Sequence, residues 1–468
     1  MNLDDTIVAI ATPPGRGGIG VVRIAGPDAR GIASPMLRLK HELAPGRAIF
    51  GELIEPKGST GASDENRSDE QAVPHRLDEV VVTYFAKPHS YTTDDIIEIS
   101  AHGSPVVLRH IVEVALARGG RLAEPGEFTM RAFLNGRIDL TQAEAVRDLI
   151  ESQTLYQAKV AGQQLEGALS KRLKPIKQKL VELIALLEAG IDFAEDDVSI
   201  AADVTILEPL AEIHALLSTL ADSFAYGKIV HEGLTLAIVG RPNVGKSSLF
   251  NRLVERERAI VTSTPGTTRD LVSETVAIGG IPVQFVDTAG IRRALDEAES
   301  IGVRKAREAL AEADLVLVVL DTSQPVVAED RDLLTQVEDG GAGIIVENKA
   351  DLVSSRFEAL SSPLPRVRTS ALIGAGIESL RTEILRYVGG EFGASQESGF
   401  LTNVRHQRLV LDSMTALGAA KTAVDNKIPH EMLLLDLYNA LRPLDEMTGA
   451  TTTDDILNLI FSTFCIGK

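Results

Sequence analysis

The chain has no tryptophan, and aromatic residues make up only 4% of its 468 residues. That scarcity argues against an aromatic stacking platform for single-stranded nucleic acid. Cys465 is the only cysteine, so an intramolecular disulfide framework is excluded and a reducing, cytoplasmic location is expected. The N-terminus lacks a basic region followed by an apolar run, and we find no long apolar stretch free of charges and helix breakers. We therefore expect neither a signal peptide nor a membrane span.

Positive charge is also in short supply. The chain carries 47 Lys and Arg against 66 Asp and Glu, which gives a net charge of −19. A uniformly basic RNA-binding surface is therefore excluded, whereas a local basic patch is not. The hydrophobic fraction of 44% and the length of 468 residues indicate a globular protein, large enough for about two to four domains.

Four segments differ in their hydrophobic patterning. Residues 1–138 mix short apolar runs with one helical stretch, Val106 to Arg118, which indicates an α+β domain. Residues 139–230 and 389–468 have helical periodicity, and residues 231–388 between them read as an α/β domain. We expect an all-α domain interrupted by an inserted domain, with the helical texture stopping near Tyr226.

Two local signals refine this division. Thr141 to Glu144 fits a capping box, which would start the helical region. The polar stretch from Glu55 to Arg76 is expected to be a long surface loop, and we assign it no function.

A complete phosphate-binding loop begins the inserted domain. Gly240 to Ser247 reads Gly-Arg-Pro-Asn-Val-Gly-Lys-Ser, between an apolar strand-like run and a helix start. This setting presents backbone N–H groups and a helix N-terminus to phosphate oxygens. Lys246 would reach the terminal phosphates and the Ser247 hydroxyl would bind Mg²⁺. The nucleotide contacts expected in this loop are Asn243, Val244, Gly245, Lys246, Ser247 and Ser248.

Two later motifs identify the nucleotide as GTP. Asp287 in Asp287-Thr288-Ala289-Gly290 would hold Mg²⁺ through water, and the Gly290 N–H would sense the γ-phosphate. In Asn348-Lys349-Ala350-Asp351, the Asp351 carboxylate can accept from the N1–H and exocyclic amine of guanine, which adenine lacks. The segment Ser370, Ala371 and Leu372 would close over the guanine O6.

One departure affects the mechanism of hydrolysis. Many GTPases place a water-orienting glutamine directly after Asp-x-x-Gly, but Ile291 occupies that position here. Another polar group must orient the water, or hydrolysis does not occur. The acidic stretch Asp296 to Gly302 holds the candidates, and the competing interpretation is a solvated loop and helix cap.

Four further segments are distinctive: Asp5 to Gly20, Arg121 to Leu140, Thr264 to Asp270 and the terminal Cys465-Ile-Gly-Lys468. With these segments, the chain resembles the MnmE/TrmE family of tRNA-uridine-modification GTPases from end to end. The resemblance implies an α+β folate-binding N-terminal domain, an all-α helical domain and an inserted α/β Ras-like P-loop GTPase domain. Related bacterial GTPases share the phosphate loop and the Gly-Thr-Thr-Arg-Asp run, so those two motifs alone do not decide.

The resemblance also implies partners and a modification site. Family members form homodimers and act with the flavoprotein MnmG (GidA), which supplies FAD, in a heterotetramer. Together they modify C5 of the wobble uridine of certain tRNAs with a one-carbon unit from 5-formyl- or 5,10-methylene-tetrahydrofolate. Read without the resemblance, Arg23 would be a surface charge at a strand edge and Glu98 an outward-facing strand residue. The folate contacts that the resemblance implies are Arg23, Glu98, Arg137 (commonly lysine in relatives) and Lys468.

For hydrolysis, the resemblance implies a potassium ion in place of an arginine finger. Its expected ligands are the Asn243 side chain and backbone carbonyls at Thr262, Thr264 and Thr267. Thr268 would complete the Mg²⁺ site, Glu299 would orient the attacking water, and Cys465 would take part in tRNA modification. The same stretch adds nucleotide contacts at Thr262, Ser263, Thr264, Pro265, Gly266, Thr267 and Thr268.

Two alternatives come from other classes of protein. A ribosome-assembly GTPase would carry a basic RNA-binding module with a Gly-x-x-Gly clamp after the GTPase domain, and the acidic helical region here argues against it. A nucleotide-gated scaffold would bind GTP and barely hydrolyse it, which Ile291 permits.

Overall fold

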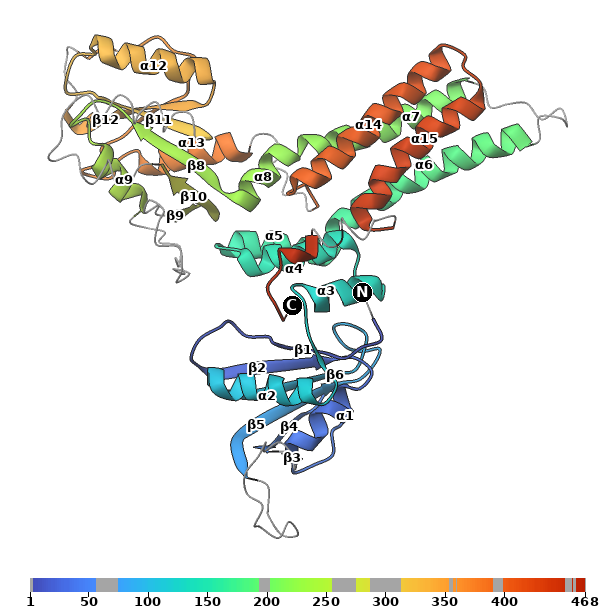
Figure 1. Cartoon of the computed structure of the whole chain (residues 1–468). Coiled ribbons are helices and arrows are strands. Elements are labelled where there is room, and N and C mark those ends of the chain that lie inside the picture. Colours follow the sequence, from blue (N-terminus) through green and yellow to red (C-terminus); the bar gives the residue numbers. More distant parts are fainter. Residues whose placement is uncertain are drawn as a thin grey trace, which may run out of the picture. The chain divides into compact units, whose positions relative to one another are not determined.

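The computed structural model of the protein describes residues 3–55, 75–192, 203–254, 275–286, 313–352, 357–358, 360–389, 399–450, 457 and 460–467. The chain divides into two compact units (Figure 1). One consists of Met1–Arg147 with Thr448–Lys468, and the other of Asp148–Met447. The C-terminal residues therefore group with the N-terminal domain and not with the helices that precede them.

The first unit is built on a seven-stranded sheet with the order β3-β4-β5-β6-β2-β1-β7. Side chains alternate between its two faces, so Val22 and Ile24 enter one hydrophobic cluster while Arg23 faces the other side. The strands are β1 (Ile7–Ile10), β2 (Gly17–Ala25), β3 (Leu37–Leu39), β4 (Ala48–Ile54), β5 (Arg76–Phe85), β6 (Ile96–Gly103) and β7 (Arg121–Leu122).

Helices cover both faces of this sheet. Ile32 of α1 and Ile111 of α2 are buried with Val22 on one face, and Phe128 of α3 is buried with Ile7 on the other. The helical stretch expected from Val106 is α2. The elements are α1 (Ala29–Ala33), η1 (Ser34–Met36), α2 (Pro105–Ala117), α3 (Glu127–Leu134) and α4 (Leu140–Glu151).

The capping box predicted at Thr141 to Glu144 is wrong. Thr141 and Glu144 lie inside α4, which begins at Leu140. Asp139 is the residue that caps the helix: its Oδ1 accepts from Gln142 N at 2.9 Å, and Gln142 Oε1 accepts from Asp139 N at 2.9 Å. The reciprocal pair has the required spacing of three, and an aspartate caps as well as a threonine, so the helix starts two residues earlier.

The helices of the second unit pack through an apolar stripe. In α6 the buried side chains recur every three or four residues, as Leu169, Leu173, Ile176 and Leu180 do, and they join a cluster with α7, α14 and α15. The helical texture continues beyond Tyr226, because α8 ends at Glu232. The helices are α5 (Leu155–Leu165), α6 (Ala168–Asp192), α7 (Asp203–Asp222), α8 (Phe224–Glu232), α14 (Val404–Asp425) and α15 (His430–Thr448).

One stretch of these helices, Val204–Glu232, has the length and mean hydropathy (1.3) of a membrane span. This is weak evidence for a span, because the core helix of a soluble protein meets the same test. Its residues Ile213 and Leu217 are fully buried in the cluster formed with α6 and α14.

The second unit also holds a six-stranded sheet with the order β13-β12-β11-β8-β10-β9, in which only the β9–β10 pair is antiparallel. Helices α9 and α13 share a core with one face of this sheet, and α12 packs against the other. The elements are β8 (Leu234–Val239), α9 (Lys246–Val254), β9 (Thr275–Ile278), β10 (Ile281–Phe285), β11 (Leu315–Asp321), α12 (Ala328–Gly340), β12 (Gly343–Asn348), η3 (Ala350–Leu352), β13 (Arg366–Arg368) and α13 (Ile377–Gly389).

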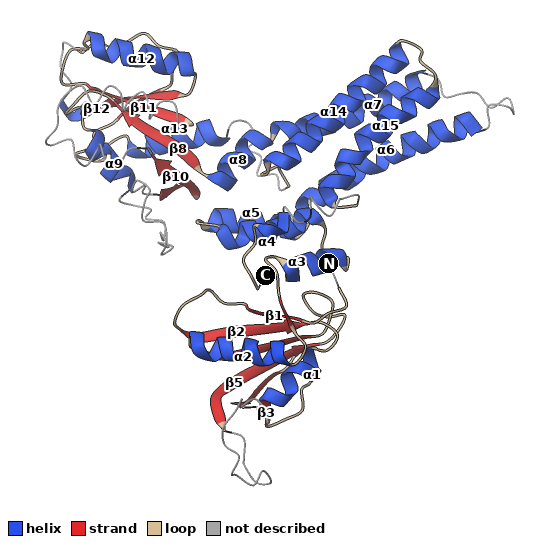
Figure 2. Cartoon of the chain, viewed as in Figure 1, coloured by secondary structure: helices blue, strands red, loops and turns tan. Residues whose placement is uncertain are grey.

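Figure 2 shows the strands gathered into two sheets, with helices making up most of the remainder. This is the predicted fold class: an α+β N-terminal domain, an all-α domain and an inserted α/β domain, whose sheet is mostly parallel. In such a sheet, ligands bind beyond the carboxyl ends of the parallel strands. The loops that follow β8 and β12 are therefore where the functional residues of the inserted domain should meet.

Candidate nucleotide-binding and folate-binding sites

The loop from Gly240 to Gly245 joins the end of β8 to the start of α9. Its backbone takes left-handed conformations at Gly240 (φ 149°), Asn243 (φ 66°) and Gly245 (φ 99°). Glycine adopts these angles without steric cost, and asparagine is the side chain that tolerates them best. A Cβ at Gly240 would also come within 2.5 Å of the Val319 carbonyl oxygen of β11. The two glycines therefore have a steric reason to be present.

Lys246 lies over this loop. Its Nζ donates to the carbonyl oxygens of Gly240 and Arg241, both at 2.7 Å, and burial lowers the pKa of its ammonium group. The amine is thus held at the centre of the loop, where the terminal phosphates of a nucleotide would bind. Ser247 and Ser248 follow in the first turn of α9 and are exposed.

Asn348 ends β12 and begins the motif Asn348 to Asp351 that is expected to bind the guanine base (the base motif). Its buried side chain connects the base motif to the phosphate loop. Its Nδ2 donates to the Val244 carbonyl oxygen at 2.9 Å, while its Oδ1 accepts from Ala371 N at 3.1 Å and Thr369 Oγ1 at 3.3 Å. One side chain therefore positions three segments that the sequence predicts around the nucleotide. Sequence reasoning placed Asn348 at the base edge and did not foresee this bracing role.

The remaining base-motif residues extend from this point. Lys349 takes a left-handed conformation (φ 61°), and its Nζ pairs with the buried Asp321 of β11 at 2.6 Å. Asp351 follows in η3 and is exposed, with its carboxylate available to a ligand. Burial opposes ionisation of Asp321, but hydrogen bonds from Lys349 and Ser323 outweigh it and lower the pKa of Asp321. The Lys349–Asp321 pair therefore fixes the motif to the sheet.

The segment after β13 is held against α9. Arg252 Nε donates to the Ala371 carbonyl oxygen at 2.9 Å, and Arg252 Nη2 donates to the Leu372 carbonyl oxygen at 2.7 Å. Ser370 and Ala371 are buried, whereas the Leu372 side chain is 74% exposed. The structure thus brings the phosphate loop, Asn348 to Asp351 and residues 370–372 together.

Several predicted site residues lie outside the described residues. They are the switch residues Thr262, Ser263, Thr264, Pro265, Gly266, Thr267 and Thr268, the motif Asp287, Thr288, Ala289 and Gly290, the proposed water-orienting Glu299, and the C-terminal Lys468. The predicted surface loop is also outside them over residues 56–74.

In the first unit, Arg23 and Glu98 are direct cross-strand neighbours on β2 and β6. Arg23 donates to Glu98 Oε1 from Nε at 2.9 Å and from its terminal nitrogen at 2.7 Å. The two side chains are only 18% and 24% exposed. Arg23 is therefore neither a free surface charge nor on an edge strand, since β2 lies between β6 and β1.

A tyrosine that sequence reasoning missed brings Arg137 into the same cluster. The guanidinium carbons of Arg137 and Arg23 lie 5.0 Å and 5.7 Å from the centroid of the Tyr91 ring. The Tyr91 hydroxyl pairs with Thr129 Oγ1 at 2.9 Å, and burial raises the pKa of Tyr91. The signal in the sequence is weak: a single tyrosine seven residues before Glu98. The geometry nevertheless groups three of the four residues that the family resemblance implies for folate.

The C-terminal segment lies beside these strands. Gly126 N donates to the Cys465 carbonyl oxygen at 3.4 Å, and a Cβ at Gly467 would come within 2.5 Å of the Ile10 carbonyl oxygen. Ile10 follows Ala9, the residue of β1 that pairs with Arg23. Cys465 is exposed. It therefore differs from most lone cysteines, which are buried and behave as small hydrophobic residues.

An ion network, also missed by sequence reasoning, connects two of the resemblance motifs. Arg121 donates to Asp5 at 2.6 Å and to Glu127 at 2.5 Å. Arg131, which is fully buried, pairs with Asp5 and with Glu127, the latter at 2.9 Å. Burial would raise the pKa of both carboxyl groups, but the hydrogen bonds and charges of the two arginines lower it in each case. These motif residues therefore join the first residues of the chain to α3.

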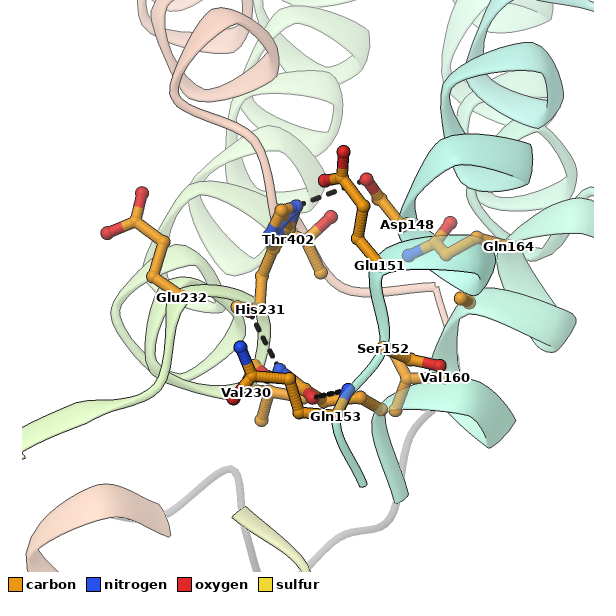
Figure 3. Close-up of a pocket in the computed structure, with 12 residues that line it drawn as sticks. Asp148, Glu151, Ser152, Gln153, Val160, Gln164, Val230, His231, Glu232 and Thr402 are labelled. Atoms are coloured by element: carbon orange, nitrogen blue, oxygen red, sulfur yellow. Dashed lines mark hydrogen bonds and ion pairs between the residues drawn. The ribbon is translucent and has the colours of Figure 1, made fainter. Parts of the chain in front are cut away.

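A cavity of about 170 Å³ lies elsewhere in the second unit, lined by α4, α5 and α8. Its lining includes none of the predicted nucleotide-binding residues. Figure 3 shows Asp148 and His231 on its wall, where His231 Nε2 and Asp148 Oδ1 are 3.1 Å apart.

A phosphate loop between β8 and α9, tied by a buried asparagine to an Asn-Lys-x-Asp motif, defines an enzyme of the P-loop GTPase class. Comparisons with known proteins agree. The GTP-binding protein TrmE N-terminus family matches residues 6–137, and the MnmE helical domain family matches residues 140–465. The tRNA modification GTPase MnmE of Koribacter versatilis is 66% identical over 100% of both chains. That of Aquifex aeolicus is 42% identical over 99% of this chain and 100% of its own.

Among solved structures, the G domain of the T. maritima FeoB iron transporter matches 33% of this chain and 98% of its own, with 25% identity and a TM-score of 0.25. The chain belongs to the MnmE family of tRNA modification GTPases. It is a GTP-hydrolysing enzyme, and GTP and Mg²⁺ are the ligands that its class requires.

Proposed function

We propose that this GTPase modifies C5 of the wobble uridine of certain tRNAs, together with an MnmG (GidA) flavoprotein that supplies FAD. The added carboxymethylaminomethyl-type group would take its one-carbon unit from 5-formyl- or 5,10-methylene-tetrahydrofolate. The protein would act in the cytoplasm as a homodimer, within a heterotetramer with the flavoprotein. The domains that carry these functions would be 1–138 for folate and dimerisation, 139–230 and 389–468 for the helical domain, and 231–388 for GTP.

The observation that carries the folate proposal is the meeting of Arg23, Glu98 and Arg137 around Tyr91. Two guanidinium groups and one carboxylate suit a ligand with an acidic glutamate tail and a pterin ring bearing N–H donors. The residues present therefore fit a folate. Bound there, the folate would supply the one-carbon unit, while these side chains bind and orient it. Lys468 would add a further contact, since Gly467 packs against β1 beside Arg23.

Cys465 is the residue of this region with nucleophilic chemistry. Cys465 lies two residues before Gly467, which packs on β1 beside the proposed folate site. This position supports a role in modification. The thiolate is the reactive form of cysteine, so a nucleophilic role requires that it ionise when tRNA is bound. Cys465→Ser should keep GTP hydrolysis and lose tRNA modification, and normal modification by this variant would remove Cys465 from the reaction.

For the hydrolytic step, we propose that a potassium ion supplies the positive charge between the phosphates, bound by Asn243 and the carbonyls of Thr262, Thr264 and Thr267. Thr268 would complete the Mg²⁺ site with Ser247, and Glu299 would orient water where Ile291 cannot. The place of Asn243 within the phosphate loop supports this, because the residue is exposed and its amide offers an oxygen ligand. Dimerisation of the GTPase domains would order the carbonyl ligands.

Nucleoside analysis of tRNA tests the proposal as a whole. A strain lacking this protein should lose the modified wobble uridine, and the wild-type gene should restore it. Arg137→Ala should fail to restore it although the protein hydrolyses GTP, whereas Arg118→Ala serves as the matched control. Normal wobble nucleosides in the deleted strain would refute the function. Loss of rRNA processing instead would favour the ribosome-assembly alternative.

A further inference from the structure

We infer that Tyr156, on α5 outside the GTPase domain, is a positioning residue for GTP hydrolysis. It acts through the turn between β9 and β10, against which its side chain packs. Tyr156 would affect the hydrolysis step alone, so this role does not depend on folate or on the tRNA product, but it rests on the proposed placement of residues 262–268 and Asp287 at the γ-phosphate.

The contact is set by two consecutive glycines. Gly279 and Gly280 both have positive φ values, 60° and 85°, which is the geometry of a type I′ hairpin turn. A Cβ on Gly280 would come within 2.8 Å of the Tyr156 Cβ, and one on Gly279 within 2.7 Å of the Leu385 side chain of α13. The turn is therefore enclosed between α5 and α13, with no space for a side chain at either position.

Helix α5 is itself firmly held against α8, which leads into the GTPase domain. Gln157 Nε2 donates to the last carbonyl groups of α8, at 3.0 Å to Val230 O and 2.8 Å to His231 O. The Tyr156 hydroxyl pairs with the Tyr226 hydroxyl at 2.5 Å, and burial together with this hydrogen bond raises the pKa of Tyr226. Figure 3 shows the facing residues of this joint, with Val230 and His231 opposite Gln153.

Apolar packing makes the joint continuous with the core of the GTPase domain. Val160, one turn along α5 from Tyr156, is 8% exposed and belongs to the same cluster as Val276 of β9 and Ile281 of β10. Tyr156 and Tyr226 pack against that cluster too. Since buried packing is dense and resists small displacements, a shift of α5 must be accommodated by the hairpin.

The hairpin is the structural link between the two segments that the sequence places at the γ-phosphate. Residues 262–268 precede β9, which begins at Thr275, and Asp287 comes after Val286, the residue that follows β10. The turn fixes the register of the two strands, with Ile278 opposite Ile281, so a displacement of the turn displaces both strands. Hydrolysis depends on such placement to within about 1 Å, whereas nucleotide affinity comes mainly from the phosphate loop and the base motif.

Tyr156→Ala tests this, with Tyr156→Phe as the conservative variant and Tyr438→Ala, an exposed helical tyrosine, as the control. In the full-length protein with Mg²⁺ and potassium, we expect Tyr156→Ala to lower kcat about tenfold while the Kd for a fluorescent GDP stays within about twofold. The phenylalanine variant keeps the ring on Gly280 and should retain most of the rate.

A purely structural role would lower nucleotide affinity and thermal stability together with the rate, so the separation of kcat from Kd is the decisive readout. Gln157→Leu provides a second variant if Tyr156→Ala is unstable. It releases α5 from α8 with Tyr156 in place, and a fall in kcat of about threefold is expected. A Tyr156→Ala enzyme that is as fast as wild type, or faster, would overturn the inference. So would a phenylalanine variant as slow as the alanine one.

Discussion

The side-chain amide of Asn348 donates a hydrogen bond to the carbonyl oxygen of Val244 at 2.9 Å, and this contact is buried. It ties the motif that would select guanine to the loop that would bind phosphate. The same amide accepts from Ala371 N, so the segment after β13 depends on it as well. One residue thus organises both ends of the nucleotide site.

Asn348→Ala should weaken binding of GDP and GTP alike, by at least tenfold. The substitution leaves the Val244 carbonyl and the Ala371 N–H without their partner, and each such loss costs about 1–3 kcal/mol when the groups are buried. Fluorescent-nucleotide titration measures the affinities, and a thermal scan of the ligand-free protein should show a lower Tm. An affinity within twofold of wild type would mean that the contact does not hold the site together.

Asp351→Asn should behave differently, because Asp351 is exposed and makes no bracing contact in the described part of the chain. We expect weaker GTP binding, a gain in affinity for xanthosine nucleotides and an unchanged Tm. The new amide donates to the xanthine O2, where the carboxylate accepted from the guanine amine. The same nucleotide titration, run with GDP and XDP, checks the exchange. Equal GDP affinity in variant and wild type would count against Asp351 as the base-selecting residue.

The GTPase site could be predicted from the sequence because its residues come in short contiguous motifs, each in a strand–loop setting that fixes its geometry. The links between motifs could not. Asn348 reaches Val244 across 104 positions, and Arg23 meets Glu98 through the register of β2 on β6. Such pairs depend on strand order, which no local pattern encodes.

Helix starts illustrate the same limit. Thr141 with Glu144 and Asp139 with Gln142 both have the spacing of a capping box, so the spacing cannot choose between them. In the structure, the reciprocal hydrogen bonds form between Asp139 and Gln142. The grouping of the C-terminal residues with the first unit is likewise a matter of tertiary packing.

The network of Asp5, Arg121, Glu127 and Arg131 predicts a loss of stability in acid. Both carboxyl groups have a pKa lowered below the ordinary values of 3.8 and 4.5. Their contribution is therefore complete above these ordinary values and is lost as pH falls through the lower pKa values of the folded state. In calorimetry of the full chain, we expect the unfolding transition of the first unit to move to lower temperature below about pH 4.5.

Glu127→Gln tests that assignment at neutral pH. It leaves Arg131 buried with Asp5 still as a charge partner, so we expect a loss of about 1–3 kcal/mol, less than for a buried charge left unpaired. It should also remove much of the acid sensitivity of the transition. Glu124→Gln, at a neighbouring exposed position, is the control and should change neither. A Glu127→Gln protein with wild-type stability at pH 7 would show that the network adds nothing net.

Tyr91 should control folate affinity. Its ring lies against the guanidinium groups of Arg23 and Arg137, and cation–π contacts contribute about 0.5–2 kcal/mol each. Tyr91→Leu should therefore weaken binding of 5-formyltetrahydrofolate about tenfold or more, while Tyr91→Phe stays close to wild type. Isothermal titration calorimetry measures both. If the wild type itself binds no folate, the proposed site is wrong. If the leucine variant binds folate as tightly as the wild type, Tyr91 is not part of the site.

Potassium dependence is predicted from the family resemblance, with Asn243 of the phosphate loop as the proposed side-chain ligand. GTP hydrolysis should be much faster in potassium than in sodium, because a dehydrated potassium ion matches a ring of carbonyl oxygens better than the smaller sodium ion. Asn243→Ala should abolish that difference and leave GDP binding within severalfold of wild type.

Glu299→Ala should stop hydrolysis while GTP binding and potassium-driven association of the GTPase domains with a transition-state mimic persist. Asp296→Ala, three residues away in the same acidic stretch, is the matched control and should hydrolyse GTP normally. Equal rates in the two salts would remove potassium and Asn243 from the mechanism, and full activity of Glu299→Ala would remove Glu299.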